Sequence, residues 1–184
     1  MRIVVGVSGA SGAPYAQRLL SHLATREDVE THVVFTKTGR LVWRHELGTD
    51  PADLGLPIYG PSDMTAPFAS GSADFQGLAI VPCSAGCMGR IANGISADLL
   101  GRTADVMLKE RRRLVLCLRE APYSLVHVRN MEQLLLAGAR VLPASPNFYS
   151  GPSSVQDLLD TVVGRVLDQL GLENDLVQRW KGLP

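Results

Sequence analysis

The chain has 184 residues, 46% of them hydrophobic, and its 18 Lys and Arg residues balance 18 Asp and Glu residues. This composition is that of a globular protein, so a mainly disordered chain is excluded, and the lack of a basic excess argues against a duplex nucleic-acid binder. No run approaches 18 consecutive apolar residues and no signal-peptide pattern begins the chain, so we expect no contact with a membrane. Three cysteines give no disulfide framework and favour a reducing, cytoplasmic setting.

Strand and helix patterns alternate along the chain. Short apolar β-branched runs predict strands at 2–8, 31–36, 78–81, 114–118 and 140–142. Helical periodicity predicts helices around 16–23 and at 37–46, 85–110 with a break near 93–94, 124–137, 155–170 and 173–180. Residues 47–76 predict a long loop with a short strand near 57–59, and Pro82 is expected to end the third main strand.

This alternation predicts one α/β domain over residues 1–184, a three-layer, doubly wound parallel sheet. Ligands of such folds lie beyond the carboxyl ends of the strands. We therefore expect one site, ringed by the five segments that follow the strands: 8–13, 36–46, 82–90, 119–123 and 143–151.

A glycine-rich turn follows the first strand. Residues 6–12 have the spacing G-x-x-G-x-x-G, which lets an anion approach the N–H groups of the next helix, and Ser8 and Ser11 add hydroxyl donors. A dinucleotide site expects an acidic residue after the second strand, but this chain has Thr36-Lys37-Thr38 there. The pattern favours a mononucleotide such as FMN, with a purely structural tight turn as the alternative.

Two cysteines lie in the turn after the third main strand. Cys83 and Cys87 lack the further ligands that a zinc site requires, because the four histidines are scattered, so we predict no metal site. One interpretation is that both cysteines are small packing residues. The other is that one of them is a catalytic nucleophile, although no neighbouring base is visible in the sequence.

Charged and aromatic residues follow the last two main strands. Arg119 and Glu120 come directly after a buried strand, where an Arg can hold phosphate and a Glu can move protons, unless the two form an ordinary ion pair. The run at 109–113 is typical of a solvated helix end. Residues 143–149 hold two prolines and two aromatics, which indicates a rigid loop presenting a ring and a phenol.

The ordered set of these segments resembles the UbiX-type flavin prenyltransferases, within the flavoprotein group that also contains the homo-oligomeric flavin-containing Cys decarboxylases. The matching residues span nearly the whole chain: Ser8–Ala13, Ser70–Ser72, Pro82–Ser84, Arg102–Val106, Lys109–Arg112, Arg119–Pro122, Pro143–Tyr149 and Arg179–Trp180.

The resemblance implies a flavodoxin-like (Rossmann-like) fold and a cytoplasmic enzyme. Such an enzyme transfers a dimethylallyl group from dimethylallyl phosphate to N5 of reduced FMN and then closes a ring at C6, without a metal. The product, prenylated FMN, serves UbiD-type decarboxylases. The resemblance also implies a homo-oligomer, typically a dodecamer, with active sites between subunits.

The resemblance also places roles on residues. FMN contacts fall on Gly9, Ala10, Ser11, Thr36, Ser84, Ala85, Gly86, Cys87 and Arg119. Prenyl phosphate contacts fall on Lys109, Arg119, Tyr149 and Arg165. Catalytic positions fall on Glu46, Glu120, Tyr149 and Trp180. Cys87 replaces a Thr of many relatives, Arg102 matches a site position of undefined role, and Arg165 has the alternative of a helix-boundary residue.

Two other functions are compatible with part of this pattern. An FMN-dependent cysteine decarboxylase would carry, by resemblance, a site histidine before the third main strand, but the chain has no His between residues 46 and 126. A non-catalytic flavin carrier would leave the basic and acidic residues of the matched set without a joint purpose.

Overall fold

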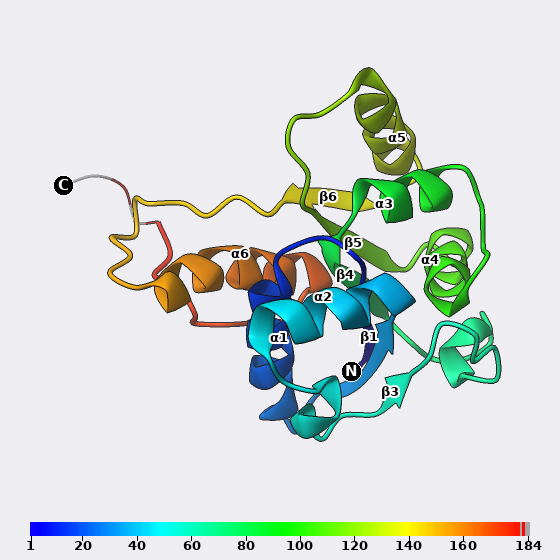
Figure 1. Cartoon of the computed structure of the whole chain (residues 1–184), viewed down its shortest axis with the longest axis horizontal. Coiled ribbons are helices and arrows are strands. Elements are labelled where there is room, and N and C mark those ends of the chain that lie inside the picture. The colour runs from blue at the N-terminus through cyan, green and yellow to red at the C-terminus, as the bar shows by residue number, and fades with distance from the viewer. Residues whose placement is uncertain (181, 183–184) are drawn as a thin grey trace.

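The computed structural model describes residues 1–180 and Gly182, and its core is a six-stranded parallel sheet in the order β3-β2-β1-β4-β5-β6 (Figure 1). The strands are β1 (Arg2–Val7), β2 (Glu30–Phe35), β3 (Ile58–Tyr59), β4 (Gly77–Cys83), β5 (Arg113–Leu118) and β6 (Arg140–Pro143). All neighbouring strands are parallel. The predicted doubly wound, flavodoxin-like α/β fold is confirmed.

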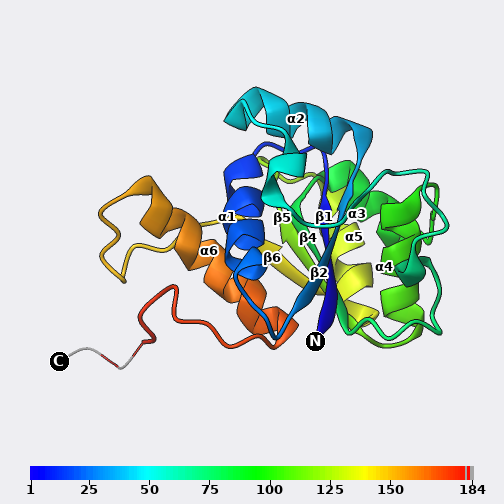
Figure 2. The same cartoon turned by 90° about the horizontal axis from the view of Figure 1, so that it is seen from below.

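Helices cover both faces of the sheet. One face carries α1 (Ala13–Ala24) and α6 (Val155–Leu170), and the other carries α3 (Ala85–Ala92), α4 (Leu99–Lys109) and α5 (Leu125–Leu136) (Figure 2). Helix α2 (Lys37–Leu47) lies across the end of the sheet rather than on a face. None of the helices in the described part of the chain is long and apolar enough to cross a membrane.

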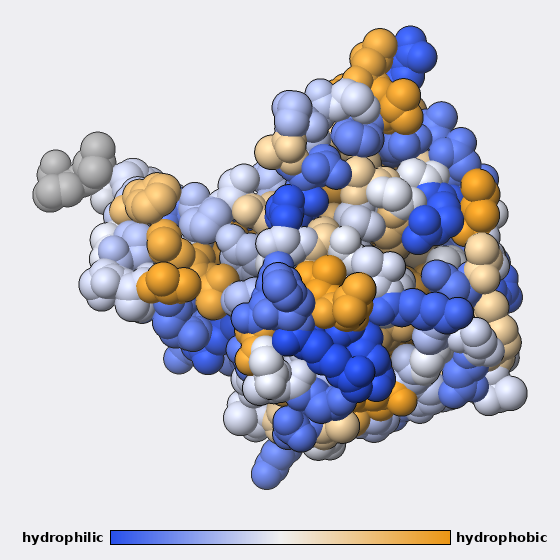
Figure 3. Space-filling view, viewed as in Figure 1, coloured by the Kyte–Doolittle hydropathy of each residue, from blue (hydrophilic) through white to orange (hydrophobic). Residues whose placement is uncertain are grey.

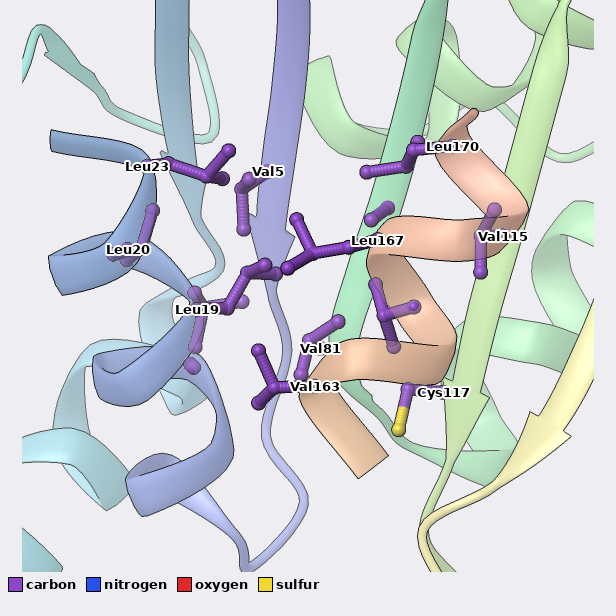
Figure 4. Close-up of a cluster of buried hydrophobic side chains, with 14 of the residues drawn as sticks. Val5, Leu19, Leu20, Leu23, Val81, Val115, Cys117, Val163, Leu167 and Leu170 are labelled. Atoms are coloured by element: carbon purple, nitrogen blue, oxygen red, sulfur yellow. The ribbon is translucent and has the colours of Figure 1, made fainter. Parts of the chain in front are cut away.

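The larger core joins α1 and α6 to the sheet. Leu19 of α1 and Leu167 of α6 point toward each other beside Val5 of β1, and Val115 of β5 lies next to α6; all four are fully buried (Figure 4). Each buried Leu or Val of this kind contributes roughly 1.5–3 kcal/mol of hydrophobic stabilisation. The predicted helix at 155–170 forms with those bounds, starts at a Ser154 capping box and ends at Gly171, whose φ is 74°.

The segment between α2 and β4 is the long loop that the sequence predicts. It contains β3 and two short 3₁₀ turns, at Pro51–Leu54 and Pro67–Ala69. Pro61 accepts a hydrogen bond from the N–H of Leu99 at 2.8 Å, which fastens the loop to the start of α4.

Pro82 does not end its strand, contrary to prediction. β4 continues through Pro82 to Cys83, with a shift in register against β5 between Ile80 and Cys83. An irregularity of this kind accommodates a residue that has no N–H for the ladder. The carbonyl of Pro82 still contributes, because it accepts hydrogen bonds from the backbone and side chain of Ser8.

The predicted helix at 173–180 is wrong. This segment has no helical structure and lies along α6. Eight residues are too few for a helix that stands without packing support. The side chains bind α6 instead, because Asn174 donates to the carbonyl of Gly164 and Arg179 to the carboxylate of Asp168.

Candidate active site

A cavity of about 610 Å³ opens beyond the carboxyl ends of β1, β2 and β4. The strand order reverses at this place, since the chain runs outward from β1 to β3 and then returns to β4 beside β1. Ligands of doubly wound folds bind at such a point. The lining residues are Ser8, Gly9, Thr36, Lys37, Thr38, Pro61, Ser62, Met64, Ser84, Arg90, Ala97 and Asp98.

Two helices begin at this cavity. The side chain of Thr36 caps α2 and accepts from the N–H of Gly39, and the side chain of Ser84 caps α3 and accepts from the N–H of Cys87. The N–H groups that precede these bonds have no acceptor within residues 1–180: Lys37, Thr38, Ala85 and Gly86. Free N–H groups at two helix N-termini, aimed at one cavity, form an anion-binding site.

The charged side chains of the cavity wall also favour an anion. Lys37 and Arg90 are exposed there, and neither forms an ion pair with an acid among the described residues. The one acid of the wall, Asp98, is the N-cap of α4, and its carboxylate accepts a hydrogen bond from the N–H of Gly101 at 2.8 Å. The wall therefore attracts a phosphate group.

The first turn of α1 is used differently from the prediction. The carboxylate of Glu46 accepts hydrogen bonds from the N–H of Gly12 at 2.9 Å and of Ala13 at 2.7 Å. These are the N–H groups that the sequence offered to an anion, so the protein's own carboxylate already caps this helix. Ser8 is not a free donor either, because it is 1% exposed, donates to the carbonyl of Pro82 and accepts from the N–H of Ser84.

Glu46 is held in its ionised form. Burial raises its pKa, but hydrogen bonds from the Ser11 hydroxyl and from the backbone of Gly12 and Ala13 outweigh burial, so the pKa lies below its ordinary value. The guanidinium of Arg119 lowers the pKa further. A carboxylate in this state can accept a proton but has none to give at neutral pH.

Arg119 and Glu120 lie at the same edge of the sheet, directly after β5, as predicted. Arg119 donates from Nε to the carbonyl of Ser11 at 3.0 Å, so it bridges the turn after β5 to the turn after β1. Glu120 is half-buried and accepts only the N–H of Ala121, at 3.1 Å. The predicted ion-pair alternative does not form, because no salt bridge joins Arg119 to Glu120 in the described chain.

The predicted FMN residues surround the cavity to different degrees. Gly9, Thr36 and Ser84 line it, whereas Ala10, Ala85 and Cys87 are buried behind it. Ser11 and Gly86 are exposed in the adjoining turns. Sequence reasoning missed Lys37, Thr38, Arg90 and Asp98. A Thr or Ser directly after a strand, as at 36 and 84, is a typical N-cap. Recognising Thr36 as a cap would have indicated that the N–H groups of Lys37 and Thr38 face the site.

The cysteines behave as packing residues. Cys83, Cys87 and Cys117 are free and buried. Burial raises the pKa of Cys117 to about 12, and a hydrogen bond between Cys83 and Cys87 raises the pKa of Cys83 and lowers that of Cys87. Within the described residues no group of three His, Cys, Asp or Glu side chains is placed to hold a metal.

The predicted prenyl phosphate residues do not meet within one chain. Lys109 ends α4 at the amino edge of the sheet, where it pairs with Glu110. Arg119 lies beyond the carboxyl end of β5, whose six residues span about 20 Å. A single phosphate cannot contact both side chains of the same chain.

A second cluster forms beside α6. Tyr149 and Trp180 pack edge to face with ring centroids 5.6 Å apart, and together with Arg165 they line a smaller cavity of about 150 Å³. This cluster lies on the α6 side of the sheet, away from α3 and α4 (Figures 1 and 2). Arg165 is exposed and paired with Asp168, so it is not merely a boundary residue with a buried stem.

Comparison with known proteins agrees with this geometry. Residues 1–167 match the Flavoprotein family. The flavin prenyltransferase UbiX of Halalkalibacterium halodurans is 44% identical, over 96% of this chain and 91% of the relative.

Two solved structures are similar over their whole length. AnUbiX (PadA1), in complex with FMN and dimethylallyl pyrophosphate, superposes with a TM-score of 0.94 at 42% identity, over 100% of this chain and 98% of that one. A dodecameric FMN-dependent UbiX-like decarboxylase from Escherichia coli O157:H7 superposes with a TM-score of 0.95 at 39% identity, over 99% and 100%.

Proposed function

The chain belongs to the Flavoprotein family and, within it, to the UbiX-type flavin prenyltransferases, and on this premise we propose that it transfers a dimethylallyl group to reduced FMN. The new bonds form first at N5 and then at C6, and the product is prenylated FMN. The observation that carries this proposal is the cavity at the ends of β1, β2 and β4, where two helix N-termini converge. Its size and charge suit the ribityl phosphate of a mononucleotide.

Different residues around this cavity bind different parts of FMN. The free N–H groups at the starts of α2 and α3, with Lys37 and Arg90, bind the phosphate. Gly9 has no side chain, so Thr38 at the start of α2 packs against the turn after β1; an added Cβ would lie 2.5 Å from the Thr38 side chain. Arg119 brings a positive charge to that turn, because its Nε donates to the carbonyl of Ser11 at 3.0 Å. FMN supplies the nucleophilic ring atoms.

The donor is dimethylallyl phosphate, whose allylic C–O bond breaks to leave a carbocation and a free phosphate. Arg119, Lys109, Arg165 and Tyr149 bind the departing phosphate through charge-assisted hydrogen bonds. Trp180 offers an aromatic face to the cation. The charge that a metal would otherwise supply comes from these basic side chains.

Neighbouring copies complete the active site. Lys109 and Arg119 of one chain lie at opposite edges of the sheet, so a phosphate that contacts both must lie between two chains. Helix α5 supports an assembly, because it leaves Leu125 and Val126 at its start and Leu136 at its end exposed, by 64%, 64% and 83%. Figure 3 shows exposed apolar side chains where α5 lies in Figure 1. The E. coli O157:H7 relative is dodecameric, and we infer the same state here.

Glu46 and Glu120 handle protons in this scheme. Glu46 is ionised and hydrogen-bonded to the turn after β1, so it accepts a proton or stabilises positive charge. Glu120 keeps one carboxylate oxygen free of protein donors in the described chain. For the second bond, the prenyl double bond takes up the proton that N5 releases, which leaves a tertiary carbocation. C6 then attacks this carbon, and Glu120 removes the C6 proton.

The proposal also includes the cellular compartment, the domain organisation and the protein that receives the product. We place the reaction in the cytoplasm, because the three free thiols fit a reducing compartment. The whole chain acts as one flavoprotein domain, since a single sheet draws its strands from residues 2–143 and α6 packs on it. A UbiD-type decarboxylase receives the prenylated FMN.

The test is anaerobic incubation with reduced FMN and a prenyl donor, followed by mass spectrometry of the extracted flavin. We expect the flavin to gain one five-carbon C₅H₈ unit. Dimethylallyl pyrophosphate, the ligand of the AnUbiX structure, is run in parallel to decide between donors. A flavin of unchanged mass with both donors would contradict the proposal.

A further inference from the structure

We propose that Asp168 is a positioning residue that orients Arg165 and fastens residues 171–180 onto α6, so that the prenyl phosphate meets a preformed pocket. This inference rests on the proposed function, because it assigns Arg165 and Trp180 to the prenyl donor. It adds a residue that does not touch the substrate itself.

Asp168 is the centre of a hydrogen-bonded cluster on α6. Its carboxylate accepts two hydrogen bonds from Arg179, both of 2.7 Å, and one from Nη1 of Arg165 at 2.8 Å. Asn174 adds a fourth at 3.1 Å. The Asp168 side chain is only 15% exposed, whereas the two arginine side chains are each 57% exposed. The fixed carboxylate therefore sets the positions of two arginines that would otherwise move freely.

The same contacts fasten the C-terminal segment. Asn174 donates to the carbonyl of Gly164 at 3.2 Å, and a Cβ added at Gly164 would lie 3.1 Å from Oδ1 of Asn174. The segment thus packs closely on α6 where the helix has no side chain. Arg179 precedes Trp180, whose ring then rests against Tyr149. These contacts enclose the cavity of about 150 Å³.

The cluster leaves Arg165 able to bind phosphate. A guanidinium has five donors, and Arg165 gives Asp168 only those of Nη1, so its remaining donors are available. The two arginines and Asp168 together carry one net positive charge, which attracts an anion. An exposed arginine loses side-chain conformational entropy when it binds a phosphate, which weakens binding. Because Asp168 already fixes Arg165, less of this entropy is lost on binding.

The kinetic test compares Asp168→Asn with Asp160→Asn. Asp160 lies on the same helix and pairs with Arg18, so its variant removes the same charge and an ion pair without touching the cluster. We expect Asp168→Asn to raise the KM for dimethylallyl phosphate about 2- to 10-fold, the range for freeing one long side chain, and to change kcat little. In an Arg165→Met background the same substitution should raise KM clearly less, because only the fastening of residues 171–180 remains to be lost. An unchanged or lowered KM, or an equal rise in both backgrounds, would overturn the proposal.

The second readout needs no catalysis. The chain has two tryptophans, and Trp43 is 1% exposed, so acrylamide quenches Trp180. We expect both Asp168→Asn and Arg179→Gln to increase this quenching, and Asp160→Asn to leave it unchanged. Unchanged quenching in the first two variants would overturn the fastening of the segment. If no variant and no parent protein prenylates FMN, the proposed function fails, and the quenching result still decides the structural claim.

Discussion

At the scale of single residues, two carboxylates near the cavity lie in different surroundings. Glu46 caps α1 and is bonded to the backbone of Gly12 and Ala13, whereas Glu120 contacts only the N–H of its neighbour Ala121. The first is therefore part of the scaffold as well as of the chemistry, and the second is free to act on a substrate. Substitutions at the two positions have different expected effects.

Glu46 makes stability depend on pH in the acid range. Its folded-state pKa lies below the ordinary value of 4.5, so the stabilisation is complete above the unfolded-state pKa and is lost as pH falls through the folded-state pKa. We expect Glu46→Gln to lower the free energy of unfolding by about 1 kcal/mol at neutral pH, as for other helix caps. The difference from the parent should shrink below pH 4.5 in urea titrations at stepped pH. A difference that stays constant down to pH 3, about one unit below the ordinary Asp and Glu range, would contradict this reading.

Glu120→Gln and Tyr149→Phe should damage different steps. The amide at 120 leaves FMN and donor binding intact but slows turnover about 10²–10⁴-fold, the usual contribution of a proton-transfer group. Loss of the phenol hydroxyl at 149 weakens donor binding by about 1.5–3 kcal/mol, the range for a hydrogen bond to a charged group.

Single-turnover prenylation at varied donor concentration separates the two effects. Flavin absorbance serves as the control, since FMN occupancy should equal that of the parent in both variants. Parent-like rate and half-saturation in both variants would place neither residue in the active site.

At the scale of elements, the anion site is built by α2 and α3 rather than by α1. Sequence patterns predicted one site ringed by five segments, and the cavity is lined by three of these, 8–13, 36–46 and 82–90, but not by 119–123 or 143–151. They did not predict that Glu46, ten residues into α2, would fold back onto the start of α1, because that contact joins positions 33 and 34 residues apart. The helix predicted at 173–180 failed for a similar reason, since Asp168 and Gly164 offer that segment partners that periodicity cannot reveal.

The start of α2 depends on the missing side chain of Gly39. A Cβ at this position would lie 2.3 Å from the carbonyl oxygen of Val7, so the helix would have to move away from β1. We expect Gly39→Ala to lower the free energy of unfolding by about 1–3 kcal/mol, as overpacking does, and to weaken FMN binding with it. Gly60→Ala is the control, because nothing lies within 4 Å of its added Cβ. Equal stability and FMN affinity in the two variants would show that α2 does not need this close approach.

The two helix N-termini also predict that the cavity prefers a mononucleotide to a dinucleotide. In the proposed function the cavity holds one phosphate, and residues 36–38 offer no acid for the second ribose of a dinucleotide. We therefore expect FMN to bind more tightly than FAD or NAD in calorimetric titrations. Phosphate-free riboflavin should lose much of the affinity. Preferential uptake of FAD or NAD would contradict the assignment of the cavity.

At the scale of the whole molecule, the proposed functional residues of the described chain lie in three separate places. The cavity at the carboxyl edge carries the flavin residues, while Lys109 lies at the amino edge and Tyr149, Arg165 and Trp180 lie beside α6. The sequence patterns predicted one ring from the segments that follow the strands, and of these last four residues the ring included only Tyr149. Lys109, Arg165 and Trp180 were added by the family resemblance, which does not say where each residue lies in the fold. Sequence patterns carry no information on contacts between copies, which a phosphate bound by both Lys109 and Arg119 would require because β5 is about 20 Å long.

The most direct test of this account is a mixed assembly of two inactive variants. Lys109→Met and Arg119→Met chains, each expected to prenylate FMN at a small fraction of the parent rate, are co-expressed with different tags and purified through both. If each active site takes Arg119 from one chain and Lys109 from another, random pairing leaves about a quarter of the sites intact in a symmetric assembly. We therefore expect the mixed oligomer to recover prenylated FMN formation well above either variant alone. A mixed oligomer no more active than its separate components would contradict a flavin prenyltransferase site shared between chains.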